Sequence, residues 1–459
     1  MEETPKPDRG GDEGKGIHGI KGFPEGFIDW NDSRTIRQMQ SVDRWVAKRL
    51  KATIIGFVGF GKSNIGLMAI RRLLNAKPEA EVLVIVPSEP VGKQWKKLLA
   101  ECTSSFERIR VMTMKKAAKD YRKLDCNLLV IDEVHKAATP SMRNCLKIPH
   151  NFILCLTATF ERLDGRHKYV EKFAPVADRI TLAEGVKNGW TSSHNIYCVL
   201  CSTGKDTDEY VKLSQKFREA FEYFNFDFDA PKMIISDKDY RKRWLLERVN
   251  EYCKVYGIET SSQEAVDLYK AKMGEMMKNA RDFLKTMIAR RDYIYHHPAK
   301  LRIAEKIIEA YKDKKGITFW CSIEDAKKVK YGKAYTSDDG KAGQEILEGF
   351  LRAKSGVINT VRKLNEGFNC PEIEYGIIAG FNSSKTMGEQ QKGRVVRIND
   401  LTKNKKAKVF YITLKGTQDV VWMNRALDGV EYLTILEEDL DAFLRGEDID
   451  FAPNPKGKG

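Results

Sequence analysis

The stretch ATIIGFVGFGKSNIGLMAI, residues 52–70, decides the fold class of this chain. It opens with an apolar run that is typical of a buried strand, passes through a glycine-rich turn and ends in an amphipathic segment with helical spacing. The same alternation continues between residues 82 and 159, in VLVIVP and VGKQWKKLLA, then in NLLVIDE and FILCLTAT. Apolar runs that alternate with helical segments indicate parallel strands with helices on both faces of the sheet. We therefore predict an α/β fold.

A second block of the same kind begins near residue 300. Its helical segment LRIAEKIIEAY is followed by the strand candidates ITFWCS, GVINTV, YGIIAGF and KVFYITL, so two α/β lobes are predicted. The region between the blocks is charged and helical, which predicts a helical insertion in or before the second lobe. We expect a flexible tail at 1–30, a first lobe at 31–192, a second lobe at 193–447 with the insertion at 204–298, and a flexible tail at 448–459.

The insertion carries aromatic side chains at helical spacing. Tyr210, Leu213, Phe217 and Phe221 fall on one face of a predicted helix, and FEYFNFDFD, residues 221–229, is a candidate hairpin. Such aromatic side chains either stack on nucleic-acid bases or pack inside the insertion. The acidic residues among them favour packing.

Composition limits the classes of protein that fit. The 459 residues suit two or three domains, and 79 Lys+Arg against 64 Asp+Glu leave a net charge of +15. This excess favours a polyanionic partner, nucleic acid before an anionic membrane surface. The chain has no apolar run long enough to span a bilayer, its N-terminus lacks the apolar core of a secretory signal, and its nine cysteines are scattered. We expect a reduced, cytoplasmic protein (host cytoplasm if phage-encoded), with Cys198 and Cys201 buried in a strand.

The positive charge is concentrated in two segments. Residues 51–150 hold 18 basic and 9 acidic side chains, and residues 385–408 hold 8 and 2. The second segment ends in a lysine run before a predicted strand. A solvated loop is the default interpretation of such a run, and a loop resting on phosphates is the alternative. The run consists of Lys403, Lys405, Lys406 and Lys408.

Residues 56–63, GFVGFGKS, match G-x-x-x-x-G-K-[ST] between a strand and a helix. The glycines allow backbone N–H groups to surround phosphate, and the helix N-terminus adds positive potential. Lys62 is expected to reach the β- and γ-phosphates, and Ser63 to supply a hydroxyl to Mg²⁺. The motif predicts an ATP and Mg²⁺ site that includes Gly56, Gly59, Gly61, Lys62 and Ser63.

A pair of carboxylates ends the apolar strand NLLVI. Asp132 and Glu133 stand at the carboxyl end of a predicted parallel strand, where open α/β sheets place their sites. We expect Asp132 to hold Mg²⁺, directly or through water, and Glu133 to polarise the attacking water.

The motifs together resemble those of the superfamily 2 helicases and translocases, in order, over most of residues 34–425. RQMQ at 37–40 resembles the element that reads adenine, VLVIVPSEPVGKQW at 82–95 resembles motif Ia, and the triplet TAT at 157–159 resembles motif III. TFWCSIEDAKKV and TVRKLNEGFNCP resemble motifs IV and V. The resemblance implies two RecA-like lobes. It also implies contacts with the nucleotide by Arg37, Gln40 and Gly367. Contacts with nucleic acid are implied for Pro87, Gln94, Thr113, Ser322, Thr360 and Asn365, and a role in coupling the two lobes for Thr157 and Thr159.

Residues 390–397, QQKGRVVR, fit the Q-x-x-G-R-x-x-R pattern of motif VI. Two arginines three positions apart at a helix start would face the γ-phosphate across the cleft and stabilise charge in the transition state. Hydrolysis would then depend on closure of the lobes, which can turn it into stepping along a strand. The catalytic residues predicted here are Gln390, Arg394 and Arg397.

The stretch 156–190 resembles the L-T-A-T-P-x-R-x-D-G continuation of the UvsW-type phage helicases, the XPB group and related restriction subunits. The chain departs from the usual pattern at Phe160, at the DEVH sequence of 132–135 and at Asn369. No departure removes a phosphate, Mg²⁺ or arginine-finger group, so we expect an active ATPase. The resemblance implies DNA rather than RNA as the nucleic-acid partner, and replication or recombination proteins as further partners.

We therefore predict an ATP-dependent DNA helicase that unwinds or branch-migrates forked or branched DNA in recombination, repair or replication. A duplex translocase that remodels protein–DNA complexes without separating strands is the first alternative, and an RNA helicase the second. The alternative outside the motor class is an ATP-gated DNA clamp.

Overall fold

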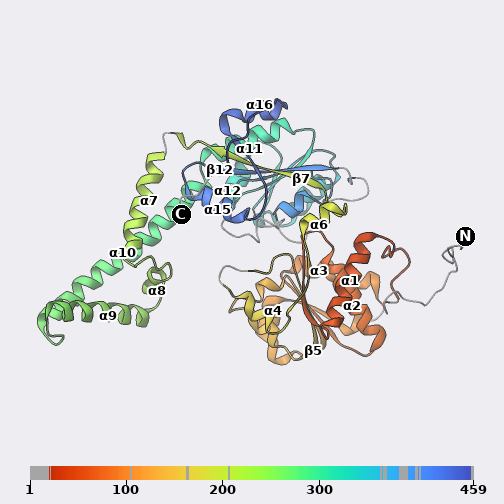
Figure 1. Cartoon of the computed structure of the whole chain (residues 1–459), viewed down its shortest axis with the longest axis horizontal. Coiled ribbons are helices and arrows are strands. Elements are labelled where there is room, and N and C mark those ends of the chain that lie inside the picture. The colour runs from red at the N-terminus through yellow and green to blue at the C-terminus, as the bar shows by residue number, and fades with distance from the viewer. Residues whose placement is uncertain are drawn as a thin grey trace, which may run out of the picture.

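The computed structural model describes residues 20, 22–103, 106–161, 165–204, 207–361, 364, 370–381, 391–397, 402 and 405–455. Figure 1 shows two α/β lobes, one above the other, and a helical arm that projects from the second lobe. The predicted architecture of two RecA-like lobes with a helical insertion is confirmed, because each lobe is built on its own parallel sheet.

The first lobe contains a six-stranded parallel sheet in the order β3-β2-β4-β5-β1-β6. Alternate residues of each strand face opposite sides, so Val84 packs with Trp95 on one face while Ile85 packs with Met114 on the other. Helices α1, α2 and α3 cover the first face, and α4 and α5 cover the second. The elements are β1 (Lys51–Gly56), β2 (Val82–Val86), β3 (Ile109–Thr113), β4 (Cys126–Asp132), β5 (His150–Thr157), β6 (Val176–Ile180), α1 (Ser33–Ala47), α2 (Lys62–Ala76), α3 (Glu89–Cys102), α4 (Met114–Asp120), α5 (His167–Glu171) and α6 (Leu182–Lys187).

The second lobe contains a seven-stranded parallel sheet in the order β13-β7-β12-β11-β8-β10-β9. Strand β7 precedes the helical insertion in the chain but lies inside this sheet, so the insertion belongs within the second lobe rather than before it. The elements are β7 (Ser193–Cys201), β8 (Lys315–Phe319), β9 (Lys333–Tyr335), β10 (Gly356–Thr360), β11 (Tyr375–Ile378), β12 (Lys406–Leu414), β13 (Leu433–Leu436), α11 (Pro298–Ala310), α12 (Ile323–Lys328), α13 (Gly340–Arg352), α15 (Gln418–Ala426) and α16 (Leu440–Arg445).

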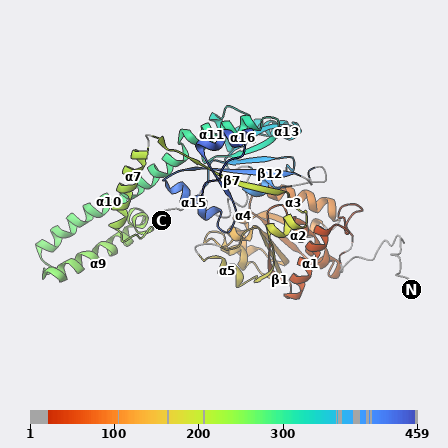
Figure 2. The same ribbon diagram turned by 45° about the horizontal axis from the view of Figure 1, so that its top comes forward.

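The insertion forms the arm, residues 207–295, which Figure 2 shows standing away from both sheets. It consists of α7 (Thr207–Glu222), α8 (Ala230–Ser236), α9 (Lys238–Tyr256) and α10 (Gln263–Tyr295). Buried side chains of the arm, among them Phe224, Leu245 and Met276, give it a core of its own. The predicted hairpin at FEYFNFDFD is wrong, because this segment ends α7 and then turns directly into α8.

The aromatic stripe of the arm is packed, as predicted. Tyr210 is buried, and the rings of Phe217 and Phe221 lie 5.0 and 5.3 Å from that of Phe283. Cys198 and Cys201 are free thiols buried in β7, which confirms that prediction as well. Among the described residues, no helix has the length and apolar character needed to cross a membrane.

Candidate nucleotide site between the lobes

The glycine-rich loop connects β1 to α2. Gly59 and Gly61 have φ angles of 96° and 90°, in the left-handed region that side chains other than hydrogen disfavour. Gly61 caps α2, and no side-chain hydrogen bond to this helix start occurs within the described part of the chain. The first N–H groups of this 15-residue helix are therefore available to an anion.

Lys62 and the two carboxylates lie next to this loop. The Lys62 ammonium donates to the Gly56 carbonyl oxygen at 3.1 Å, and its burial lowers its pKa while the charges of Glu133 and Asp132 offset part of that effect. The indole Nε1 of Trp95 donates to Asp132 at 2.9 Å. Burial, followed by the charge of Glu133, raises the pKa of Asp132.

The pKa of Glu133 shifts in the opposite direction. Burial acts to raise the pKa of Glu133, but a hydrogen bond from His135 and the charge of Lys62 outweigh burial and lower the pKa. The carboxylate lies 3.3 Å from Nδ1 of His135 and 3.4 Å from the hydroxyl of Thr157. Two adjacent carboxylates whose pKa values shift in opposite directions are candidates for different roles in one site.

The second lobe brings arginines to the same place. A Cβ built on Gly393 would lie 2.3 Å from Cβ of Val58, so a glycine is needed for this approach to the loop. A Cβ on Gly59 would lie 3.4 Å from Cγ of Arg397. Burial lowers the pKa of Arg397 to about 10.

These groups enclose a cavity of about 380 Å³ between the lobes. Its wall is formed by Arg34, Val58, Gly59, Gly61, Lys62, Ser63, Asn64, Pro87, Val91, Gln94, Trp95, Leu98, Asp132, Glu133, Trp190, Thr191, Arg394 and Arg397. The structure thus brings together the predicted Lys62, Ser63, Asp132 and Glu133 of the first lobe and the predicted arginines of the second.

The connection between the lobes reaches this cavity. Thr191 Oγ1 donates to the carbonyl oxygen of Val396 at 2.7 Å, and the Ser192 hydroxyl donates to the same oxygen at 3.0 Å. Within the first lobe, Thr157 donates to the carbonyl oxygen of Thr159 at 2.6 Å and so joins the triplet to Glu133. The lobe-coupling role of Thr157 and Thr159 stays a prediction.

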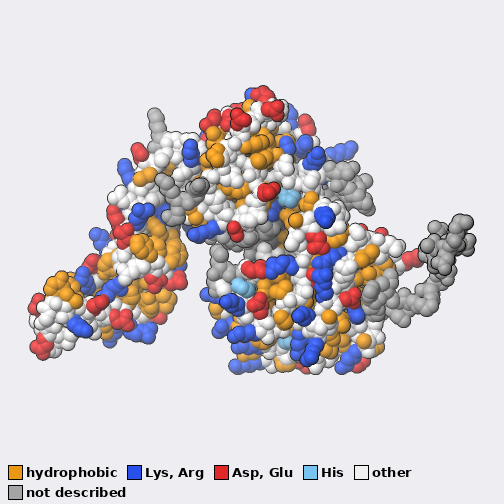
Figure 3. Space-filling view, viewed as in Figure 1, with side chains coloured by type: hydrophobic (Ala, Val, Ile, Leu, Met, Phe, Trp, Pro, Cys, Tyr) orange, Lys and Arg blue, Asp and Glu red, His pale blue; other side chains and the backbone are white. Residues whose placement is uncertain are grey.

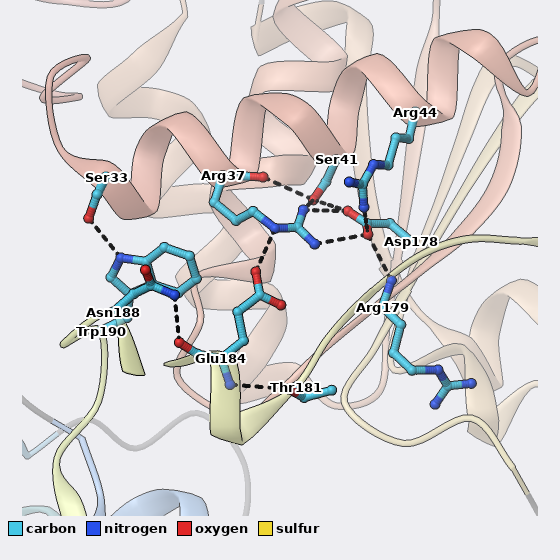
Figure 4. Close-up of polar contacts among 10 residues, drawn as sticks. All are labelled: Ser33, Arg37, Ser41, Arg44, Asp178, Arg179, Thr181, Glu184, Asn188 and Trp190. Atoms are coloured by element: carbon cyan, nitrogen blue, oxygen red, sulfur yellow. Dashed lines mark hydrogen bonds and ion pairs between the residues drawn. The ribbon is translucent and has the colours of Figure 1, made fainter. Parts of the chain in front are cut away.

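The structure does not bring Arg37 or Gln40 to the cavity. The Arg37 guanidinium binds Asp178 at 2.6 and 3.0 Å and Glu184 at 2.8 Å, so it joins α1 to β6 and α6, as Figure 4 shows. Gln40 is exposed, whereas Gln38 is buried and donates to the Phe60 carbonyl oxygen at 2.7 Å. The glutamine beside the phosphate loop is therefore Gln38, which the sequence interpretation passed over.

The residues predicted to contact nucleic acid are dispersed. Pro87 and Gln94 lie in the wall of the nucleotide cavity rather than on a separate surface. Ser322 caps α12 and donates to Asp325 at 2.6 Å. Thr360 is fully buried and donates to the Tyr335 carbonyl oxygen, and its predicted contact with nucleic acid stays a prediction.

Thr113 is half-buried at the end of β3, which leaves its predicted contact with nucleic acid open. The predicted residues Gln390, Gly367 and Asn365 lie outside the described residues. The sequence interpretation assigned no role to two tryptophans of the cavity wall, Trp95 and Trp190. Trp95 carries a signal, since it directly follows Gln94 in the motif Ia segment.

The chain has two parallel-sheet lobes, and a phosphate loop on the first faces arginines of the second. This arrangement is typical of two-lobe nucleotide-driven motors. A model of the family described as "Type III restriction enzyme, res subunit" matches residues 33–122 and 104–162. The "DNA 3'-5' translocase XPB2" of Sulfurisphaera tokodaii is 22% identical over 405 residues, which cover 83% of this chain and 82% of that protein.

Two solved structures share the fold. The DNA-bound "ATP-dependent Type ISP restriction-modification enzyme LlaBIII" has a TM-score of 0.55 at 12% identity and covers 88% of this chain, which spans only 30% of LlaBIII. S. cerevisiae Dbp5 bound to RNA and ADP BeF3 has a TM-score of 0.54 at 10% identity and covers 89% of this chain and 91% of that one. The chain therefore resembles the restriction-subunit family in its first lobe and, over about four fifths of its length, a protein named as a DNA translocase.

Proposed function

We propose that this motor is a DNA helicase that couples ATP hydrolysis to translocation and to unwinding or branch migration of forked or branched DNA in recombination, repair or replication. The observation that carries the motor part of the proposal is the approach of Gly393 to Val58, which sets Arg394 and Arg397 of one lobe against the phosphate loop of the other. Hydrolysis then requires the lobes to close, and repeated closing against a bound strand is what produces stepping.

The residues around the cavity divide the chemistry of hydrolysis. The Ser63 hydroxyl and the Asp132 carboxylate are oxygen ligands of the kind Mg²⁺ prefers, and the raised pKa of Asp132 marks a buried carboxylate that a cation would favour in its ionised form. Glu133, with its lowered pKa, is suited to accept a hydrogen bond from the attacking water. Lys62 with the two arginines would neutralise the charge that develops on the phosphates.

DNA is favoured over RNA by the relative's name. The XPB2 relative is named a DNA translocase, whereas the likeness to RNA-bound Dbp5 concerns the fold alone. The arm leaves an open gap beside the first lobe, as Figure 3 shows, which is compatible with a forked or branched substrate but does not distinguish DNA from RNA.

The name of the relative also favours the alternative of a duplex translocase without strand separation. ATPase activity should be measured with single-stranded, duplex, forked and junction DNA and with an RNA control. We expect the strongest stimulation by forked or junction DNA, and none in the Lys62→Ala variant. Equal stimulation by RNA would contradict the DNA assignment.

Strand separation needs its own comparison. Forked and four-way junction substrates should be compared with a third strand displaced from an intact duplex. If only the third strand is displaced, the chain is a translocase and the helicase proposal fails. Hydrolysis that no nucleic acid stimulates would instead favour the ATP-gated clamp.

A further inference from the structure

A single lysine ammonium, that of Lys405, is surrounded by backbone carbonyl oxygens from two separate segments. Nζ of Lys405 donates to Pro371 at 2.7 Å, to Ile373 at 2.8 Å and to Val395 at 2.9 Å, and it also contacts the carbonyl oxygen of Arg397. An ammonium has three donors and no acceptor, so this cage uses its full hydrogen-bonding capacity.

This position contradicts both interpretations of the lysine run for Lys405. The side chain is neither solvated nor turned toward phosphates, because its ammonium points into the second lobe. Lys408 lies three residues further along the chain, in β12, and donates to the Tyr311 hydroxyl at 2.8 Å. The chain therefore offers two half-buried lysines close together in sequence, one just before β12 and one within it, with different surroundings.

The two segments that Lys405 joins differ in what they carry. Residues 391–397 bear Arg394 and Arg397, both in the wall of the nucleotide cavity. Residues 371–373 lead into β11, at the centre of the second sheet. The caged carbonyl of Arg397 is separated by one Cα from the side chain that lies against Gly59 of the phosphate loop. A displacement of about 1 Å at a catalytic group can cost on the order of 10²-fold in rate.

We propose that Lys405 is a positioning residue for ATP hydrolysis, which holds Arg397 against the phosphate loop by tying the arginine-bearing segment to the sheet of the second lobe. The inference rests on ATP hydrolysis alone and is independent of which DNA structure the motor prefers. Its action requires the charged ammonium, since a neutral amine loses one donor and presents a lone pair to the carbonyl oxygens.

The requirement for a charged Lys405 ammonium can be tested by varying pH, because the surroundings of Lys405 shift its pKa. Burial lowers the pKa of Lys405 to about 8, although the charges of Cys370, Glu372 and Glu374 act in the opposite direction. Rising pH therefore removes the proton in the folded protein while the unfolded chain still holds it. Loss of that proton favours the folded state, so a fall in rate above pH 8 from this cause is not a sign of unfolding. The segment 391–397, which faces the Lys405 ammonium, carries the charged side chains of Lys392, Arg394 and Arg397.

The test compares Lys405→Met, which keeps the length and removes the charge, with Lys408→Met as the matched control three residues further along the chain. At saturating amounts of whichever DNA stimulates most, we expect Lys405→Met to lower kcat at least roughly ten-fold and to change KM for ATP less than about two-fold. The control should stay within about two-fold of wild type. A kcat of Lys405→Met within two-fold of wild type would overturn the proposal.

Two readouts separate positioning from a general structural role. In an Arg397→Ala background, Lys405→Met should cause no further loss of kcat, whereas an equal loss in both backgrounds contradicts action through Arg397. Wild-type kcat should fall through pH 8, by roughly ten-fold at about pH 9, because one unit above a pKa leaves about a tenth of a group protonated. If Lys405→Met does not fold, Lys405→Arg provides the test. A guanidinium stays charged, so the decline should shift to higher pH in Lys405→Arg, and a pH profile that coincides with that of wild type would overturn the proposal.

Discussion

A single methyl group at Gly393 should uncouple nucleotide binding from hydrolysis. The Cβ of Gly393→Ala would lie 2.3 Å from Cβ of Val58, whereas ordinary contact begins at 3.4 Å, so the second lobe must retreat by about 1 Å. The same retreat moves Arg394 and Arg397 away from the phosphate loop. At about 10²-fold for 1 Å, kcat should fall by about two orders of magnitude, which is about 2.7 kcal/mol of transition-state stabilisation.

The assay measures DNA-stimulated ATPase and, separately, the affinity for a fluorescent ATP analogue. Affinity should change little, because the phosphate loop lies wholly in the first lobe. Gly349→Ala is the matched control, since it lies in α13 of the same lobe and its Cβ would meet no described atom within 4 Å. If Gly393→Ala retains wild-type kcat, the lobes do not need this approach for hydrolysis, and the role given to the two arginines is refuted.

Three further predictions concern side chains of the first lobe. Glu133→Gln should lower kcat by about 10²- to 10⁴-fold and leave nucleotide binding in place, as single-turnover ATPase measurements would show. Gln38→Ala should raise KM for ATP and Gln40→Ala should not, because only Gln38 lies at the phosphate loop; the reverse result in steady-state kinetics would restore the sequence prediction. Asp178→Asn should lower the free energy of unfolding by about 3 kcal/mol, because it removes a partner of Arg37. Burial acts to raise the pKa of Asp178, but Arg37 and Ser41 hold the pKa below its ordinary value, so this stabilisation is present at neutral pH and is lost as pH falls through the lowered pKa. Denaturation at pH 7 and in acid should therefore show a difference between Asp178→Asn and wild type that shrinks at low pH.

Much of the candidate site was predictable because its chemistry is local. The phosphate loop needs glycines, a lysine and a hydroxyl at set spacing, and the carboxylates need only follow a buried strand, so both can be read from short stretches. The glutamine beside the phosphate loop was missed for a geometric reason. Gln38 and Gln40 are two positions apart on α1, hence about 200° apart around the helix, and the motif alone does not say which of the two faces the loop.

The surroundings of Lys405 and Thr360 could not be predicted from the sequence for a different reason. A run of lysines suggests a solvated loop, and local pattern cannot reveal that carbonyl oxygens from 371–373 and 395–397 converge on Lys405. Thr360 ends a strand in the middle of a sheet, and its burial depends on neighbours far along the chain.

The amino-acid sequence by itself determined the two parallel-sheet lobes, the helical insertion and most of the groups that we propose bind and hydrolyse nucleotide. Hydrophobic alternation and short motifs specify these features residue by residue. Only the tertiary structure decided that Arg37 forms an ion pair with Asp178, that Gly393 packs against Val58 and that the Lys405 ammonium contacts the carbonyl oxygen of Arg397. Each of these pairings except the last joins residues more than a hundred positions apart, and all three depend on how packed elements meet, which no local pattern records.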